Sequence, residues 1–196
     1  DLRTPLTRMR LQLALMTDND DTKAISRDVS EMEEMIDGYL AFAAGEGDET
    51  PQELAVDELL NRLVTQAHKS HKFDITLSQV KDDIPAFPMR RNAIQRAFSN
   101  IISNAIRYST KTIVAIRMRN DEVIITFDDN GAGIPQERRA DAIRPFIRLE
   151  ESRNRRTGGA GLGLSITSDV ILSHGGELML ADSPLGGLRV SVKLPV

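Results

Sequence analysis

The stretch TGGAGLGLSI places three glycines, Gly159, Gly161 and Gly163, directly before an apolar helical segment. Glycines at such a place leave backbone N–H groups open at the positive end of a helix, where a phosphate can approach. No Gly-Lys-Ser or Gly-Lys-Thr follows, which excludes a Walker A loop, and the dinucleotide-binding fingerprint would need glycine at Leu164. The stretch therefore predicts a phosphate-binding turn, with a glycine-rich turn that binds nothing as the alternative.

Asp129 is the second candidate, at the end of an expected strand in the stretch DDNGAGI. Gly131 and Gly133 follow it and would let the chain turn sharply and lie flat against a planar ligand. A carboxylate at the edge of an apolar pocket only accepts hydrogen bonds, so it would select a base with an amino group, such as adenine. Guanine presents an oxygen there, and two facing acceptors cost about 1–3 kcal/mol, which favours ATP over GTP. The alternative is an ordinary Asp-Asn-Gly turn.

Two asparagines, Asn100 and Asn104, stand four apart and so share one face of an expected helix. Their amide oxygens are hard ligands suited to Mg²⁺, which takes the rest of its shell from water and phosphates. We expect Asn104 to be the metal ligand. Arg107 and Tyr108 follow, where a cation and a phenol could reach a phosphate and a base. Polar residues that simply face solvent are the alternative.

A run of arginines precedes the glycine stretch, at Arg148, Arg153, Arg155 and Arg156. The segment shows little periodicity, so it predicts a loop. A basic loop beside a phosphate-binding turn would act as a lid that adds charge-assisted hydrogen bonds to a bound nucleotide. The alternative is a solvated surface loop.

The elements that must position these groups lie in residues 53–196. Apolar periodicity predicts helices over 57–68, 89–108 and 162–173. The stretches TIVAIRMR and EVIITFDD predict a hairpin that turns at Asn-Asp, and FDITLS, ELMLAD and LRVSVKLP predict further strands. Helices interleaved with mostly antiparallel strands predict an α/β sandwich, one helical layer on one sheet.

The N-terminal residues carry a heptad seam on two segments. Its members are Leu2, Leu6, Met9, Leu13 and Met16, then Ile25, Val29, Met32, Ile36 and Tyr39. The stretch TDNDDT separates the two segments, so they predict an antiparallel helical hairpin. One hairpin cannot shield both apolar stripes, which favours a four-helix bundle made by two chains and hence a homodimer. A hairpin packed on its own chain's other domain is the alternative.

We therefore predict an α+β protein with a helical hairpin over 1–44, a linker over 45–52 and a second domain over 53–196.

The composition of the whole chain limits the possible partners and metal sites. Its 29 acidic and 25 basic residues give a net charge of -4, which argues against nucleic acid as a partner. The absence of cysteine excludes disulfides and thiolate metal sites, and the presence of only three histidines argues against a zinc site. No run of 18 apolar residues occurs, so we expect the fragment to be soluble.

The stretches NIISNAIRYS, DDNGAGI and TGGAGLGLSI together resemble the N, G1 and G2 boxes of the ATP-binding domain of sensor histidine kinases. This GHKL (Bergerat) fold is shared with Hsp90, DNA gyrase and MutL. AIRPFIR resembles the F box, although Ile143 stands where phenylalanine is common. The resemblance implies ATP and Mg²⁺ as cofactors. It implies these ATP-binding residues: Asn100, Asn104, Arg107, Tyr108, Asp129, Gly131, Gly133, Ile134, Arg148, Gly159, Gly161, Leu162, Gly163 and Leu164.

The first residues, DLRTPLTRMRLQLAL, resemble the phosphoacceptor helix of the HisKA class, especially its EnvZ-like osmosensor group. In that group a histidine stands just before the residue that matches Asp1. The resemblance implies that Asp1 orients and deprotonates this histidine and that Thr4 orients water when the partner regulator is dephosphorylated. Pro5 should bend the helix beside this chemistry. His68, His71 and His174 lack the motif, so we expect structural roles for them.

The resemblance implies the catalytic core of a dimeric two-component sensor kinase. It would transfer the γ-phosphate of ATP to that histidine and then to an aspartate of an OmpR-like response regulator, with phosphatase activity toward the regulator. It would be the cytoplasmic portion of a bacterial inner-membrane sensor, and as written it should bind ATP without phosphorylating itself. One alternative is a dimeric phosphotransfer adaptor or pseudokinase. The other, an Hsp90-like or MutL-like ATPase, would need a carboxylate where Asn100 stands.

Overall fold

The computed structural model describes most of the second domain and part of residues 1–44, where a helical hairpin is predicted. The described residues are 3–16, 19, 22–23, 25–26, 29, 32, 49–71, 73–78, 83–145, 147 and 161–196, with the backbone alone at 3 and 4. Among these residues no helix combines the length and the apolar character needed to cross a bilayer.

Helix α1 (Arg3–Ala14) contains Pro5, and the described residues between 22 and 32 are helical as well. Leu6 and Val29 of the predicted seam are buried, each 3% exposed. Other seam residues stay open: Met9 is 44% exposed, Met16 56%, Ile25 47% and Met32 43%. The chain thus covers only part of the seam, which is compatible with a second copy. The homodimer stays a prediction, as does the bend at Pro5.

Asn19 explains the break between the two helical segments. Its side-chain Oδ1 accepts a hydrogen bond from the backbone N–H of Thr22 (2.8 Å), while the Thr22 hydroxyl accepts one from the backbone N–H of Asn19 (2.9 Å). This reciprocal pairing satisfies N–H groups at the start of a helix that would otherwise lack partners. Asn19 and Thr22 therefore cap the start of the second helical segment.

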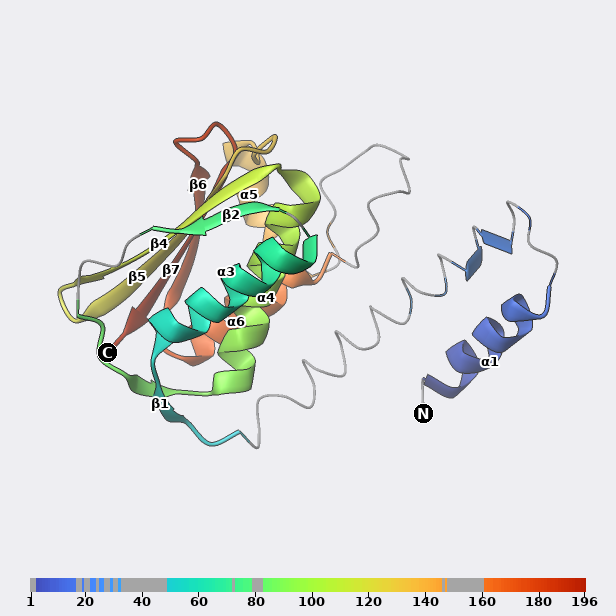
Figure 1. Cartoon of the computed structure of the whole chain (residues 1–196), viewed down its shortest axis with the longest axis horizontal. Helices are drawn as coiled ribbons and strands as arrows, with labels where there is room; N and C mark the ends of the chain where they lie inside the picture. The colour runs from blue at the N-terminus through green and yellow to red at the C-terminus, as the bar shows by residue number, and fades with distance from the viewer. Residues whose placement is uncertain are drawn as a thin grey trace.

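The second domain is a sheet covered on one face by helices (Figure 1). Its elements in chain order are β1 (Gln52–Leu54), α3 (Val56–His71), β2 (Asp74–Leu77), β3 (Phe87–Met89), α4 (Arg91–Tyr108), β4 (Lys111–Arg119), β5 (Glu122–Asp129), a 3-10 turn (Gln136–Arg138), α5 (Arg139–Ala142), α6 (Gly163–Ser173), β6 (Glu177–Asp182) and β7 (Leu188–Pro195). The predicted α+β sandwich is confirmed. β1 begins at the last residue of the predicted linker.

The main sheet has the strand order β2-β4-β5-β7-β6. Its pairs are antiparallel except β2 with β4, which is parallel, and a separate two-stranded sheet joins β1 to β3. Figure 1 shows α3, α4 and α6 together on one side of the main sheet. The rings of Phe98 on α4 and Phe127 on β5 lie 5.9 Å apart between centroids, which fastens α4 to the centre of the sheet.

The β4–β5 hairpin sets the register of the site. Asn120 and Asp121 both have left-handed backbones, with φ of 51° and 59°, as a two-residue hairpin turn of this twist requires. The register that results pairs Thr112 with Asp129. Since side chains alternate along a strand, Asp129 lies on the same helix-covered face as Phe127.

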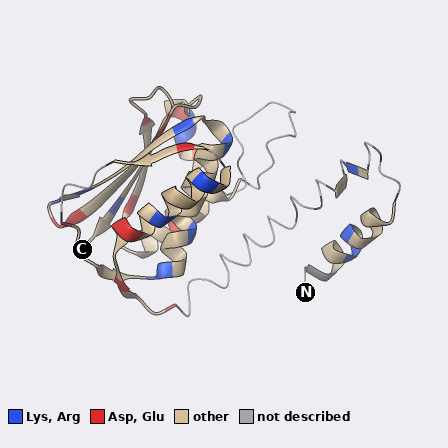
Figure 2. Cartoon of the chain, in the orientation of Figure 1, with Lys and Arg blue, Asp and Glu red and all other residues tan. Residues whose placement is uncertain are grey.

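Charged residues of both signs are interspersed over the domain (Figure 2). Some ion pairs link neighbouring strands at the surface: Lys193 Nζ lies 2.9 Å from a carboxylate oxygen of Glu177, and Lys111 Nζ lies 3.7 Å from a carboxylate oxygen of Asp74. The hydrogen bond to Glu177 raises the pKa of Lys193 above its ordinary value. Such exposed pairs contribute little to stability, so the apolar core holds the two layers together.

Candidate functional site

Asp129 ends β5 as a nearly buried carboxylate, 9% exposed. Its Oδ1 accepts two backbone hydrogen bonds, from the N–H of Gly131 at 2.8 Å and from the N–H of Leu188 at 3.0 Å. Among the described residues no hydrogen bond reaches its Oδ2. The fold therefore fixes the orientation of this carboxylate and leaves one oxygen available as an acceptor.

Glycines surround Asp129 because the backbone approaches it closely. A Cβ at Gly131 would lie closer than 3.0 Å to the carbonyl oxygen of Tyr108, and Gly133 has a left-handed φ of 69°. A Cβ at Gly187 would also lie closer than 3.0 Å to Asp129 Oδ1 and to the Gly131 nitrogen. The motif after Asp129 predicts the first two glycines as site residues. It does not predict Gly187, whose only local signal is the glycine pair before the last strand.

The N-terminus of α6 lies against the face of α4 that carries the two asparagines. Asn100 Nδ2 donates to the carbonyl oxygen of Gly163 at 3.3 Å, and the Thr167 hydroxyl donates to the same oxygen at 2.7 Å. A Cβ at Gly163 would touch the Asn104 amide at 3.6 Å. Gly161 has a φ of 68°, which favours glycine in the turn that leads into the helix. The predicted asparagine and glycine groups thus meet.

A pocket opens between α4, α6 and the sheet. Its lining residues are Ile101, Asn104, Ala105, Thr112, Phe127, Asp129, Leu164, Leu188 and Val190. Most of the wall is apolar, and three polar side chains interrupt it. A site of this kind suits a planar apolar ligand with a polar edge. Of these residues, Asn104, Asp129 and Leu164 are predicted from the sequence, whereas the part of the wall that β4 and β7 supply is not.

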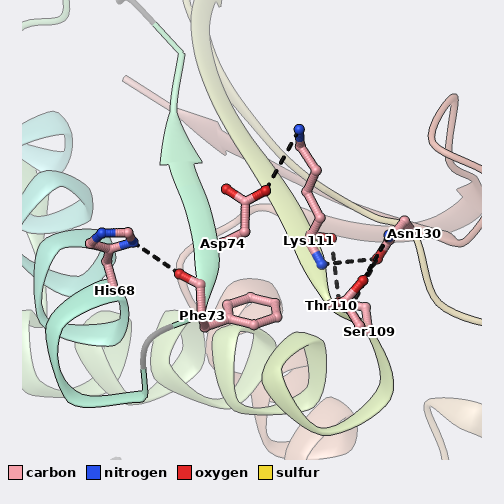
Figure 3. A network of polar contacts seen from close by, with 7 residues as sticks. All are labelled: His68, Phe73, Asp74, Ser109, Thr110, Lys111 and Asn130. Carbon is pink, nitrogen blue, oxygen red and sulfur yellow. Dashed lines mark hydrogen bonds and ion pairs between the residues drawn. The ribbon is translucent and has the colours of Figure 1, made fainter.

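Asn130 fastens the turn after Asp129 to the start of β4 (Figure 3). Its Oδ1 accepts the backbone N–H groups of Thr110 at 3.0 Å and Lys111 at 2.9 Å, and its Nδ2 donates to the Thr110 hydroxyl at 3.0 Å. These bonds hold the end of β5 beside the beginning of β4. They keep Asp129 opposite Thr112.

Residues 89–196 match the family described as histidine kinase-, DNA gyrase B-, and HSP90-like ATPase. The match spans more than half of the chain and contains α4, the turn after β5 and α6, which build the pocket. The chain belongs to this ATPase family. The match does not reach residues 1–44, so the resemblance of that region to the HisKA class stays a prediction.

Two relatives within the family are named sensor proteins. The chain is 33% identical over 207 residues to the sensor histidine kinase CpxA of Escherichia coli K12, covering 100% of this chain and 45% of that protein. It is also 33% identical over 205 residues to the sensor protein RstB of the same strain, covering 100% and 47%. These matches support a histidine kinase ATPase core. The chain spans less than half the length of both relatives.

Solved structures agree with this fold. The ATP binding domain of PrrB from Mycobacterium tuberculosis has a TM-score of 0.60 and 26% identity, over 76% of this chain and 98% of that one. Full-length ShkA in complex with AMPPNP has a TM-score of 0.74 over 99% of this chain and 43% of that one. Its identity of 19% shows a shared fold only.

Several predicted site residues of this ATPase domain lie away from the pocket wall or outside the described residues. Arg107 and Tyr108 are exposed at the end of α4 and are not among the residues that line the pocket. The carbonyl of Ile134 accepts a hydrogen bond from Arg139 Nε at 3.0 Å, which braces the turn. Leu162 is buried directly before α6. Asp1, Arg148, Gly159 and the side chain of Thr4 lie outside the described residues.

Two of the three histidines serve the fold of the ATPase domain. His68 Nδ1 lies 3.0 Å from the carbonyl oxygen of Phe73 (Figure 3). The Arg90 N–H donates to His174 Nε2 at 3.1 Å, and His174 Nδ1 lies 2.7 Å from the Val170 carbonyl oxygen. These contacts agree with the structural roles predicted for them. His71 is exposed at the end of α3.

An ion pair on the face of the sheet opposite Asp129 supports the end of β5. Arg189 Nε and Nη2 donate to the two oxygens of Asp128 at 2.7 and 2.8 Å, and Asp128 is only 6% exposed. The hydrogen bond to Asp128 raises the pKa of Arg189. Bidentate pairing of this kind fixes geometry well, so it locks β7 to β5 next to Asp129. This pair could not be predicted from the sequence, because its partners are distant in the chain.

Proposed function

We propose that this chain is the ATP-binding catalytic core of a two-component sensor histidine kinase. The observation that carries the proposal is Asp129, with one oxygen held by two backbone N–H groups and the other, in a mostly apolar pocket, without a hydrogen-bond partner among the described residues. A fixed acceptor there complements the 6-amino group of adenine. The names of the relatives, which include sensor histidine kinases, support the same function.

Mg²⁺ fits the residues beside the pocket. Among the described residues the Asn104 amide makes no hydrogen bond, so its oxygen is available to a hard cation. No group of three or more His, Cys, Asp and Glu side chains in the described part of the chain could hold a metal by itself. Asn104 would therefore share the ion with nucleotide phosphates and water, as Mg²⁺ prefers. Bound there, Mg²⁺ would neutralise phosphate charge.

The residues of this chain would act chiefly by positioning. Asp129 holds the base, while Asn104 and the N-terminus of α6 face the phosphates. The acceptor of the γ-phosphate is a histidine expected immediately before Asp1, which Asp1 would orient and deprotonate. From there the phosphoryl group would pass to an aspartate of an OmpR-like response regulator, and Thr4 would orient water for its removal.

The proposal extends to the assembly of the protein. The exposed seam residues Met9, Met16, Ile25 and Met32 support a homodimer through the N-terminal helices. We place this chain in the cytoplasmic portion of a bacterial inner-membrane sensor, because the relatives include sensor proteins of Escherichia coli. Contact with the membrane would run only through a segment that is not part of this chain.

Asn104→Ala is expected to weaken Mg-ATP binding about tenfold, the size of one lost contact to a charged group. Affinity for ATP in excess EDTA should change little, because the lost oxygen serves the cation. Isothermal titration calorimetry in Mg²⁺ and in EDTA measures both. Ser103→Ala, at the exposed neighbouring position on α4, is the matched control. An unchanged dissociation constant in excess Mg²⁺ would refute the role of Asn104.

Phosphotransfer is tested with a version of the chain that carries histidine immediately before Asp1. With ATP radiolabelled on its γ-phosphate and Mg²⁺, this version should acquire acid-labile label on that histidine. The 196-residue chain without it should bind ATP and stay unlabelled. If the histidine version binds Mg-ATP and takes up no label, the kinase proposal fails in favour of a dimeric phosphotransfer adaptor or pseudokinase.

A further inference from the structure

Thr112 carries a polar group for which the fold provides no use. Its side chain is 0% exposed, near the start of β4. Within the part of the chain that the structure describes, its hydroxyl oxygen has no hydrogen-bond partner. Buried hydroxyls are nearly always hydrogen-bonded, since an unsatisfied one loses its bonds to water without replacement. Valine has the same shape and would fill this place at lower cost.

The register places this hydroxyl beside Asp129. Thr112 and Asp129 are direct cross-strand partners, so their side chains share one face of the sheet. Both residues line the same pocket. The Asn130 bonds to Thr110 and Lys111 hold this register immediately next to the pair. The hydroxyl is closed to bulk solvent, and a partner can reach it only from the pocket.

The two side chains together match one edge of adenine. That edge carries a donor, the 6-amino group, next to an acceptor, the ring nitrogen N1. Asp129 Oδ2 is an acceptor without a described partner, and the Thr112 hydroxyl can donate. We propose that Thr112 is a second base-recognition residue, which donates its hydroxyl hydrogen to N1 of adenine while Asp129 accepts from the amino group. This inference rests on the proposed nucleotide-binding function and deepens it.

The pair of contacts would discriminate against 6-oxopurines at two positions. Hypoxanthine and guanine carry an oxygen at C6 and a hydrogen on N1, so donor and acceptor are exchanged at both atoms. Sites that hydrogen-bond a ligand reject an analogue that leaves their polar groups unpaired more strongly than apolar sites do. Thr112 thereby makes the preference for adenine stronger than Asp129 alone would.

The test compares ADP with 1-deaza-ADP, which keeps the amino group and lacks N1. The wild-type chain should bind 1-deaza-ADP about five- to tenfold more weakly than ADP, the value of one neutral hydrogen bond. Thr112→Val should lose ADP affinity by the same factor and bind both nucleotides alike. Thr112→Ser, which keeps the hydroxyl, should retain the preference. Thr126→Val removes a hydroxyl from the opposite face of the sheet and is the matched control.

Thermal unfolding without nucleotide adds a second measurement. Thr112→Val should melt at the wild-type temperature or higher, because an unsatisfied hydroxyl is replaced by a methyl group. The assignment would be overturned if Thr112→Val bound ADP with the wild-type affinity. It would also be overturned if Thr112→Val lost the same affinity for ADP and for 1-deaza-ADP, because Thr112 would then act through Asp129 and not through N1. Should Thr112→Val fail to fold, equal binding of both nucleotides by the wild type still overturns it. Absence of ADP binding by the wild type would instead overturn the proposed function, and this inference with it.

Discussion

We expect Asp129→Asn to lower the affinity for ADP about 10- to 150-fold, which is the range for the loss of a hydrogen bond to a charged group. The structure fixes how the new amide sits. The N–H groups of Gly131 and Leu188 both need an acceptor at the Oδ1 position, so the amide oxygen must take that place. The amide NH₂ then stands where the free oxygen was. It faces the amino group of adenine, donor against donor.

The same geometry predicts a reversal of base preference. An NH₂ group at the Oδ2 position can donate to the oxygen at C6 of hypoxanthine, so IDP should lose less affinity than ADP or gain some. Calorimetric titration of ADP and IDP into both proteins measures the change. Asp121→Asn, in the hairpin turn at the other end of β5, is the matched control, because asparagine tolerates its φ of 59°. Unchanged ADP affinity in Asp129→Asn would remove Asp129 from the site.

Gly187→Ala is expected to damage stability and binding together. The added Cβ would lie closer than 3.0 Å to Asp129 Oδ1, to the Gly131 nitrogen and to the Asp129 carbonyl oxygen. Two of these are backbone atoms, which cannot rotate away, so the turn and the β7 start must separate. Overpacking of this kind costs about 1–3 kcal/mol, and about 1 kcal/mol lowers the melting temperature of a chain of this size by about 2–4 °C. ADP affinity should fall more than tenfold, about the loss of the charged contact of Asp129.

Gly186→Ala separates the two effects. A Cβ at Gly186 meets nothing within 4 Å, but its φ of 95° strains any other residue. This variant should therefore lose about 1–2 kcal/mol of stability and keep its affinity for ADP. Thermal melts with ADP titrations on both variants measure the difference. If Gly187→Ala binds ADP as the wild type does, the contact between Gly187 and Asp129 has no part in the site.

The sequence predicted the parts of the fold whose signals are local. The β4–β5 hairpin follows from an Asn-Asp pair between two apolar strands, and its left-handed turn confirms it. The helix over 89–108 follows from its apolar stripe and appears as α4, which begins two residues later because Met89 ends β3. The parallel pairing of β2 with β4 could not be predicted, because parallel strands are joined through distant residues and leave no signal at a turn.

The candidate site likewise contains some residues that the sequence predicts and others that it does not. Asp129, Gly131 and Gly163 stand in short motifs whose composition points to chemistry. Thr112 is an ordinary strand residue in the sequence, since threonine favours strands in any case. Its importance comes from the register that sets it opposite Asp129. Gly187 is similar, because only the three-dimensional closeness of the two strand ends explains the missing side chain.

The hydrogen bonds to the Gly163 carbonyl oxygen affect the thermodynamics of nucleotide binding. Asn100 on α4 donates to this oxygen, so α4 and the first turn of α6 are tied before any ligand arrives. Asp129 is held with similar firmness by two backbone donors. A preorganised site loses little conformational entropy when it is filled. The adenine half of a nucleotide should therefore dock with a favourable enthalpy and only a small ordering cost in the protein.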